Sequence, residues 1–153
     1  MSMHVTLHHQ ETEQLGYELA SLLEYHKFPI VLLDGPLAAG KTTFTKGIGR
    51  ALEIKKTINS PSYTLMKMYA SDDQSKHLYH FDLYRMESGS EDYDLEEFMH
   101  SEAFVVVEWP YQVPILLPDK YVKVTFRILS DTQREIEITC HADYCVDLEQ
   151  LKR

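Results

Sequence analysis

The 153-residue chain is short of several kinds of residue, and each shortage narrows what it can be. It has only two cysteines, Cys140 and Cys145, and their spacing fits neither a C-x-x-C redox pair nor a paired zinc-binding motif. No apolar run approaches the ~20 residues that span a bilayer, and the first residues lack the basic and apolar segments of a signal peptide. We therefore expect reduced thiols in a cytoplasmic protein without membrane contact.

Positive charge is also scarce. The chain has 15 Lys and Arg residues against 24 Asp and Glu residues, which gives a net charge of −9. A protein that binds nucleic acid directly usually presents a basic face that displaces counterions from the phosphates. Unaided binding to DNA or RNA is therefore not expected, although a partner protein could hold the nucleic acid. The length predicts one domain, residues 1–153, and the 44% of hydrophobic residues suffices for a core.

Two continuous apolar runs, Ile30–Leu33 and Phe104–Val107, are typical of strands buried on both faces in a parallel sheet. A helix is predicted over 12–26, with Thr12 as its N-cap, and another over 41–52. Gly47 and Gly49 in the second helix indicate close approach to a neighbour, because glycine otherwise weakens a helix. Further predicted elements are a strand at 4–7, hairpins pairing 63–69 with 76–84 and 120–129 with 133–139, a helix at 91–99 and a final helical turn within 146–151.

The segment GPLAAGKT, residues 35–42, matches the P-loop pattern G-x-x-x-x-G-K-[ST]. It follows the first apolar strand and opens a helix, which is the context that the motif requires. Backbone N–H groups of such a loop and of the helix start form a nest for phosphate oxygens. Lys41 adds a point charge, and the Thr42 hydroxyl can bind Mg²⁺. The predicted phosphate site comprises Gly35, Leu37, Ala38, Ala39, Gly40, Lys41, Thr42 and Thr43.

Hydrolysis of a nucleotide also needs a carboxylate near the magnesium ion. Glu108 directly follows the apolar run 104–107, so it lies at the carboxyl end of a strand, where parallel sheets bind ligands. Asp82 is a second candidate, either to position the attacking water or to reach the metal through water, and its alternative is a solvated hairpin charge. Trp109 either lies near the nucleotide or packs ordinarily. No Asn-Lys-x-Asp stretch is present, which favours ATP over GTP.

Four segments together resemble the bacterial TsaE (YjeE) family. In chain order they are 37–44 (LAAGKTTF), 60–65 (SPSYTL), 80–85 (HFDLYR) and 107–110 (VEWP). The resemblance extends from about Thr12 to Arg134. With the patterns above, it predicts an α/β fold, a P-loop NTPase-like three-layer sandwich with a mixed central sheet.

The resemblance implies a Mg²⁺-dependent ATPase that binds ATP or ADP and is required for threonylcarbamoyladenosine at position 37 of tRNAs reading ANN codons. Its implied partners are TsaD and TsaB, and the chain would contact tRNA only indirectly, through the complex with them. Thr42 and Glu108 would hold Mg²⁺, Asp82 would assist hydrolysis, and Thr12 would lie near the nucleotide base. Residues 60–65 and 80–85 would form two switch loops.

The chain departs from the family pattern inside the phosphate loop. The family usually has an acidic residue where Pro36 stands and a glycine where Ala38 stands, and Ser62-Tyr63 replaces the commoner Thr-Phe. Ala38 would cost ~1 kcal/mol if the loop requires a positive φ there. Two alternative functions stay open at this point. They are a small-molecule kinase, although no arginine-rich lid is evident, and a nucleotide-gated binding module with negligible turnover.

Overall fold

The structure is a computed structural model that describes residues 1–24, 29–61, 66–83, 97, 103–109, 120–141 and 148–151. Within them, no helix is both long and apolar enough to cross a membrane. The elements are β1 (Ser2–Thr6), α1 (His9–Leu23), β2 (Ile30–Asp34), α2 (Lys41–Ala51), β3 (Met66–Ala70), β4 (His77–Asp82), β5 (Phe104–Glu108), β6 (Tyr121–Ile128), β7 (Arg134–His141) and the 3₁₀ helix η3 (Leu148–Gln150).

The strands form one seven-stranded sheet in the order β1-β7-β6-β2-β5-β4-β3. The four central strands, β6, β2, β5 and β4, run parallel to one another. The outer pairs β1–β7, β6–β7 and β3–β4 are antiparallel. This confirms the predicted mixed sheet, both hairpins and the two buried parallel strands. Parallel pairing at the centre brings the carboxyl ends of β2, β5 and β4 to one edge.

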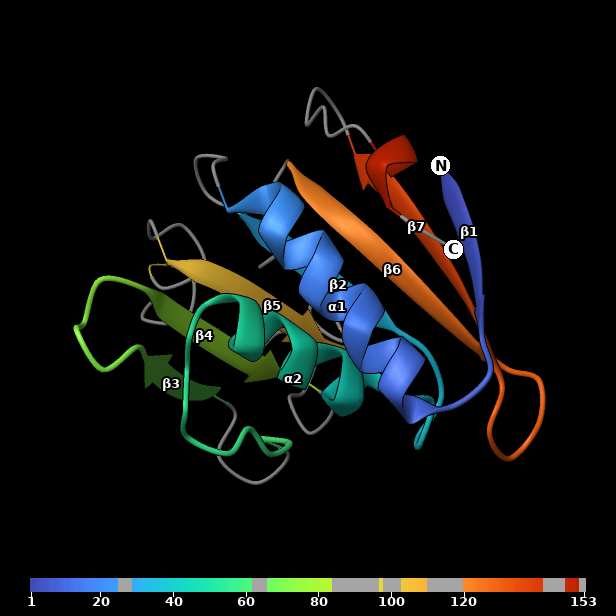
Figure 1. The fold of residues 1–153 in the computed structure, drawn as a ribbon, viewed down its shortest axis with the longest axis horizontal. Coiled ribbons are helices and arrows are strands. Elements are labelled where there is room, and N and C mark those ends of the chain that lie inside the picture. The colour runs from blue at the N-terminus through green and yellow to red at the C-terminus, as the bar shows by residue number, and fades with distance from the viewer. Residues whose placement is uncertain are drawn as a thin grey trace.

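Helices α1 and α2 lie side by side over one face of the sheet (Figure 1). Their buried leucine, phenylalanine and isoleucine side chains share a core with Val31 and Leu33 of β2 and Val106 of β5. Side chains on the opposite face, such as Leu32 and Val107, are buried as well. The helix predicted over 91–99 lies outside the described residues, apart from Glu97, which is helical.

The two helices approach so closely that their contact excludes side chains. A Cβ added to Gly47 would lie 1.9 Å from the Glu13 carbonyl oxygen, and one added to Gly16 would lie 2.1 Å from that of Phe44. This confirms that Gly47 reflects close approach to a neighbouring element. Because α2 follows the phosphate loop directly, this packing fixes where the loop sits on the sheet.

The predicted N-cap of the first helix was wrong. The helix begins at His9, its N-cap is His8, and no side chain caps it. Thr12 lies one turn inside the helix and is buried, with its hydroxyl 2.8 Å from that of Thr6 at the end of β1. The Thr12 hydroxyl therefore makes a tertiary hydrogen bond, whereas the sequence pattern predicted that it would cap the helix.

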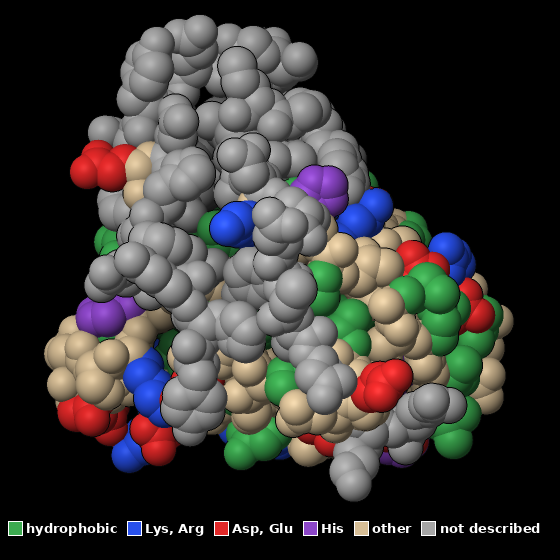
Figure 2. Space-filling model, turned by 90° about the horizontal axis from the view of Figure 1, so that it is seen from above, with side chains coloured by type: hydrophobic (Ala, Val, Ile, Leu, Met, Phe, Trp, Pro, Cys, Tyr) green, Lys and Arg blue, Asp and Glu red, His purple; other side chains and the backbone are tan. Residues whose placement is uncertain are grey.

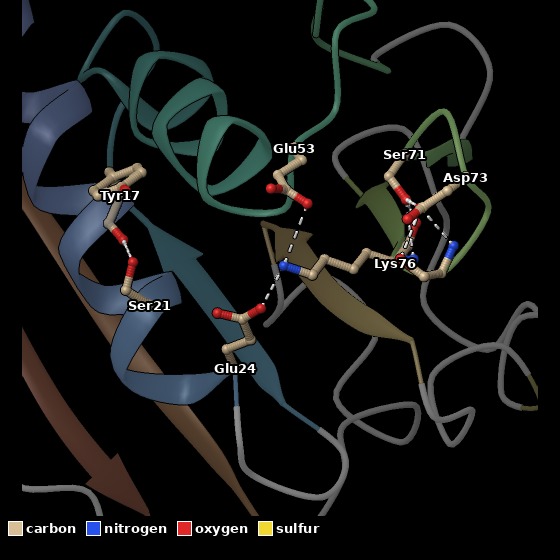
Figure 3. Close-up of polar contacts among 8 residues, drawn as sticks. Tyr17, Ser21, Glu24, Glu53, Ser71, Asp73 and Lys76 are labelled. Atoms are coloured by element: carbon tan, nitrogen blue, oxygen red, sulfur yellow. Dashed lines mark hydrogen bonds and ion pairs between the residues drawn. The ribbon is translucent and has the colours of Figure 1, made fainter.

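An ion-pair cluster joins the helices to the β3–β4 hairpin. Lys76 Nζ lies 2.5 Å from Glu24 at the end of α1 and 3.7 Å from Glu53 just beyond α2 (Figure 3). In the preceding turn, the Asp73 carboxylate accepts hydrogen bonds from the Ser71 and Ser75 hydroxyls, each at 2.7 Å. The two Lys76 contacts thus join the hairpin to the C-terminal ends of both helices, whereas the phosphate loop precedes the N-terminal end of α2.

Candidate functional site

A cavity of about 440 Å³ opens at the edge where β2, β5 and β4 end. It lies where ligands bind in open α/β sheets, beyond the carboxyl ends of the strands. The structure brings most of the predicted site residues to its walls. Those that line it are Thr12, Leu37, Ala38, Ala39, Gly40, Lys41, Thr42, Thr43, Asp82, Glu108 and Trp109.

The phosphate loop has the backbone that a nest of N–H groups requires. Gly40, the N-cap of α2, has φ of 102°, and Ala38 has φ of 62°. Left-handed residues within a loop turn successive N–H groups toward one concavity. The first residues of α2, Lys41 to Thr43, line the cavity and begin a helix whose first N–H groups have no acceptor within it. The loop therefore does hold Ala38 at a positive φ, which is the condition under which alanine costs about 1 kcal/mol relative to glycine.

Gly35 is the predicted site residue that is not part of the cavity wall. A Cβ at this position would lie 2.9 Å from the Cβ of Phe126 on β6, so the loop can leave β2 only without a side chain. Its carbonyl oxygen accepts a hydrogen bond of 2.7 Å from Lys41 Nζ. Gly35 thus allows the loop to pass close to β6, and its carbonyl oxygen orients the Lys41 side chain.

Lys41 is a buried cation, with only 5% of its surface exposed. Its Nζ lies 3.6 Å from the centroid of the Trp109 ring. Burial lowers the pKa of Lys41, while the Glu108 and Asp82 carboxylates act in the opposite direction. Burial removes most of the water around the ammonium group. Phosphate oxygens would replace that lost hydration, so the buried cation favours binding of a phosphate.

The two candidate carboxylates meet at the strand ends. Asp82 and Glu108 are register partners in the parallel β4–β5 pair, and both are buried, at 4% and 3% exposed. His80, two residues before Asp82 on the same face of β4, is fully buried, and its Nε2 lies 2.5 Å from Glu108 Oε2. From the sequence, His80 was expected only as part of a switch segment, and this contact was not predicted.

Trp109 holds an unusual backbone for a bulky residue. Its φ is 56°, in the left-handed region that large side chains rarely adopt. Its N–H donates to the Leu33 carbonyl of β2 at 3.3 Å. Such conformations persist where the surroundings enforce them, and they gather at functional sites. The chain thus turns sharply after Glu108 and sets the indole against Lys41.

Arg134 is a site residue that the sequence reasoning missed. Its guanidinium donates to the loop carbonyls of Ala38 and Ala39, each at 3.1 Å, and to those of Ser130 and Gln133 at 2.7 and 2.9 Å. It therefore ties the β6–β7 hairpin to the phosphate loop. Nothing in the sequence signals this, because the loop partners are backbone atoms 95 and 96 positions away.

Further polar residues that were not predicted as site residues also line the cavity. Ser60 lines it from the first predicted switch segment, but residues 62–65 and 84–85 of the two segments lie outside the described residues. The remaining lining residues that sequence reasoning did not assign to the site are His8, His9, Asp131 and Thr132. They come from the start of α1 and the turn between β6 and β7.

The residues at the cavity provide oxygen ligands of the kind that Mg²⁺ uses. Among the described residues, no three or more His, Cys, Asp or Glu side chains are grouped to hold a metal. Mg²⁺ commonly keeps several waters and takes one or two carboxylates together with phosphate oxygens, so it needs no such cage. The Thr42 hydroxyl and the buried Glu108 carboxylate share the cavity with the loop and fit that requirement.

Comparison with known proteins places this arrangement in a family. The family model "Threonylcarbamoyl adenosine biosynthesis protein TsaE" matches residues 6–136. Two proteins named tRNA threonylcarbamoyladenosine biosynthesis protein TsaE are similar along most of their length. The one from Bacillus subtilis is 39% identical over 81% of this chain and 78% of the relative. The one from Treponema pallidum is 37% identical over 84% of this chain and 93% of the relative.

A solved structure has the same fold. The crystal structure of Bacillus subtilis YdiB superposes with a TM-score of 0.76 and 31% identity, over 93% of this chain and 86% of that one. This neighbour confirms the predicted P-loop NTPase-like α/β fold. The chain therefore belongs to the TsaE family of tRNA threonylcarbamoyladenosine biosynthesis proteins.

Proposed function

We propose that this chain binds Mg²⁺-ATP at the cavity and hydrolyses it. The observation that carries the proposal is the meeting of a buried Lys41 with two buried strand-end carboxylates, Asp82 and Glu108, beside a loop of helix-start N–H groups. Keeping three charges out of water costs free energy, and this cost is offset when they bind a charged ligand. A nucleotide triphosphate with its metal supplies both signs of charge.

Each residue then has a distinct role. The N–H groups of Lys41 to Thr43 and the Lys41 ammonium hold the β- and γ-phosphates in place. Thr42 and Glu108 hold Mg²⁺, which supplies charge neutralisation at the phosphate oxygens. Asp82, beside Glu108 on the neighbouring strand, accepts a hydrogen bond from the attacking water and orients it.

We further propose that this hydrolysis serves formation of threonylcarbamoyladenosine at position 37 of tRNAs reading ANN codons, in the cytoplasm, with TsaD and TsaB as partners. Family membership supports the pathway. The net charge of −9 supports indirect contact with tRNA. On the face shown in Figure 2, the described basic side chains are interspersed with acidic ones instead of forming a basic surface.

The test is release of inorganic phosphate from ATP, measured with Mg²⁺ in the presence and absence of TsaD and TsaB. We expect slow release by the chain alone and faster release with the partners. Lys41→Ala should abolish tight ATP binding, because it removes the cation of the phosphate site. No phosphate release under either condition would overturn the ATPase, and unchanged ATP affinity of Lys41→Ala would overturn the phosphate site itself.

The same assay separates hydrolysis from gating alone. Asp82→Asn keeps the size of the side chain but weakens its ability to accept a proton or orient water. We expect this variant to bind ATP and the partners normally, to lose phosphate release and to fail to support tRNA modification. Normal modification by a variant without hydrolysis would instead favour a nucleotide-gated module, and a phosphorylated metabolite would favour a kinase.

A further inference from the structure

His80 and Glu108 form a buried contact that the roles above leave unused. His80 is fully buried and Glu108 is 3% exposed, with 2.5 Å between His80 Nε2 and Glu108 Oε2. A carboxylate that binds Mg²⁺ is ionised and can only accept, so in that state His80 Nε2 donates the hydrogen bond. The contact comes from adjacent parallel strands, where His80 is paired with Val106 and therefore lies diagonally across from Glu108.

Only one of the two ring nitrogens of His80 is hydrogen-bonded among the described residues, and its partner is Glu108. Nδ1 is buried and has no hydrogen-bond partner among the described residues. A buried polar atom without a partner costs free energy, and such atoms persist mainly where the residue serves another purpose. A leucine here would bury more favourably beside Leu78, which is fully buried two residues earlier on the same face of β4.

Glu108 needs such a partner if it is to present one oxygen to the cavity. The carboxylate has two oxygens, and His80 occupies Oε2. That leaves Oε1 as the oxygen available toward the cavity that Glu108 lines with Thr42. Carboxylates that bind metals are commonly held by a second hydrogen bond of this kind, and its loss typically weakens metal binding.

We propose that His80 is a positioning residue that fixes the rotamer of Glu108 for Mg²⁺ and thereby sets how much Mg²⁺ strengthens nucleotide binding. The proposal rests on the proposed Mg²⁺-nucleotide site. It assigns no proton transfer to His80 and no direct contact with the nucleotide. His80 acts through Glu108, so its effect belongs to binding that depends on the metal.

The experiment compares ADP affinity with and without Mg²⁺, by titration calorimetry, in wild type and two variants. His80→Leu removes the donor but keeps an apolar volume, and His80→Gln places an amide N–H near the position of Nε2. Without Mg²⁺, we expect His80→Leu to bind ADP as tightly as wild type does. The factor by which Mg²⁺ raises the ADP affinity should be about 10- to 100-fold smaller in His80→Leu than in wild type. His80→Gln should recover most of that gain.

The outcomes separate this proposal from the one on which it rests. A wild-type chain that binds ADP no more tightly with Mg²⁺ would overturn the metal part of the proposed function. A wild-type gain that His80→Leu retains, or an equal loss with and without Mg²⁺, would overturn the positioning role and indicate a structural one. If His80→Leu does not fold, His80→Asn replaces it, because its shorter amide does not reach Glu108; a retained gain would again overturn the proposal.

Discussion

Ala38 occupies a backbone conformation that suits glycine better. Its φ of 62° lies in the left-handed region, where a Cβ meets the following carbonyl oxygen. We expect Ala38→Gly to raise the free energy of unfolding by about 1 kcal/mol, because relief of this strain exceeds the added freedom of the unfolded chain. Urea unfolding of the nucleotide-free protein measures the change.

The adjacent alanine is the matched control for that substitution. Ala39 is fully buried and does not have a positive φ. Ala39→Gly removes a buried methyl and adds only freedom, so it should lower the free energy of unfolding by about 1 kcal/mol. Equal effects of the two substitutions would show that the left-handed backbone at Ala38 carries no strain.

At the residue scale, sequence reasoning located the groups whose place follows from a strand end. Glu108 and Asp82 were predicted because an apolar run or a β-like stretch leads directly to them, and the structure puts them side by side. His80 and Arg134 were not given their roles, because each acts through a contact between distant parts of the chain. Such contacts depend on strand order, which local patterns do not encode.

At the scale of elements, the β6–β7 hairpin supports the phosphate loop through Arg134. Lys in its place keeps the charge but lacks the planar fork that reaches several carbonyls at once. We expect Arg134→Lys to weaken ADP binding by about tenfold, the equivalent of one hydrogen bond from a charged donor. The reason is that a loop without this support must be ordered when the nucleotide binds. Titration calorimetry measures the affinity.

Arg127 provides the control on the same hairpin. It is exposed and pairs with Glu135 of the neighbouring strand at 2.8 Å, without contact to the loop. Arg127→Lys should leave ADP affinity unchanged. A similar loss in both variants would mean that the loss does not come from the four carbonyl contacts of Arg134.

Helices and strands were predicted correctly where the hydrophobic periodicity was unambiguous. Predictions failed where tertiary contacts set the start of an element or the pairing of strands. The apolar run Ile30–Leu33 and the alternation in 120–129 matched β2 and β6 closely. The start of α1 was misplaced because Thr12 bonds to β1 instead of capping the helix. The pairing of β1 with β7 was not predicted, because it joins segments from opposite ends of the chain.

At the scale of the whole molecule, the ligand site and the stability of the fold make opposing demands on Lys41. Burial lowers its pKa below the ordinary 10.5, so the folded state releases the proton more readily than the unfolded state. The unfolding free energy of the nucleotide-free protein should therefore rise as pH increases between that lowered value and 10.5. Below the lowered value both states are protonated, and the folded protein bears the full cost of the buried charge.

Lys41→Met tests this opposition, because methionine fills the space without a charge. Without nucleotide, we expect the variant to unfold at a higher temperature than wild type and to lack the rise in stability with pH. With Mg²⁺-ADP at about 100 times its Kd, wild type should gain about 2.7 kcal/mol, and Lys41→Met should gain nothing. Lys46→Met, an exposed lysine on the same helix, should behave as wild type in both respects. A nucleotide-free Lys41→Met that is less stable than wild type would show that the contacts of Lys41 with Gly35 and Trp109 outweigh the cost of burying its charge.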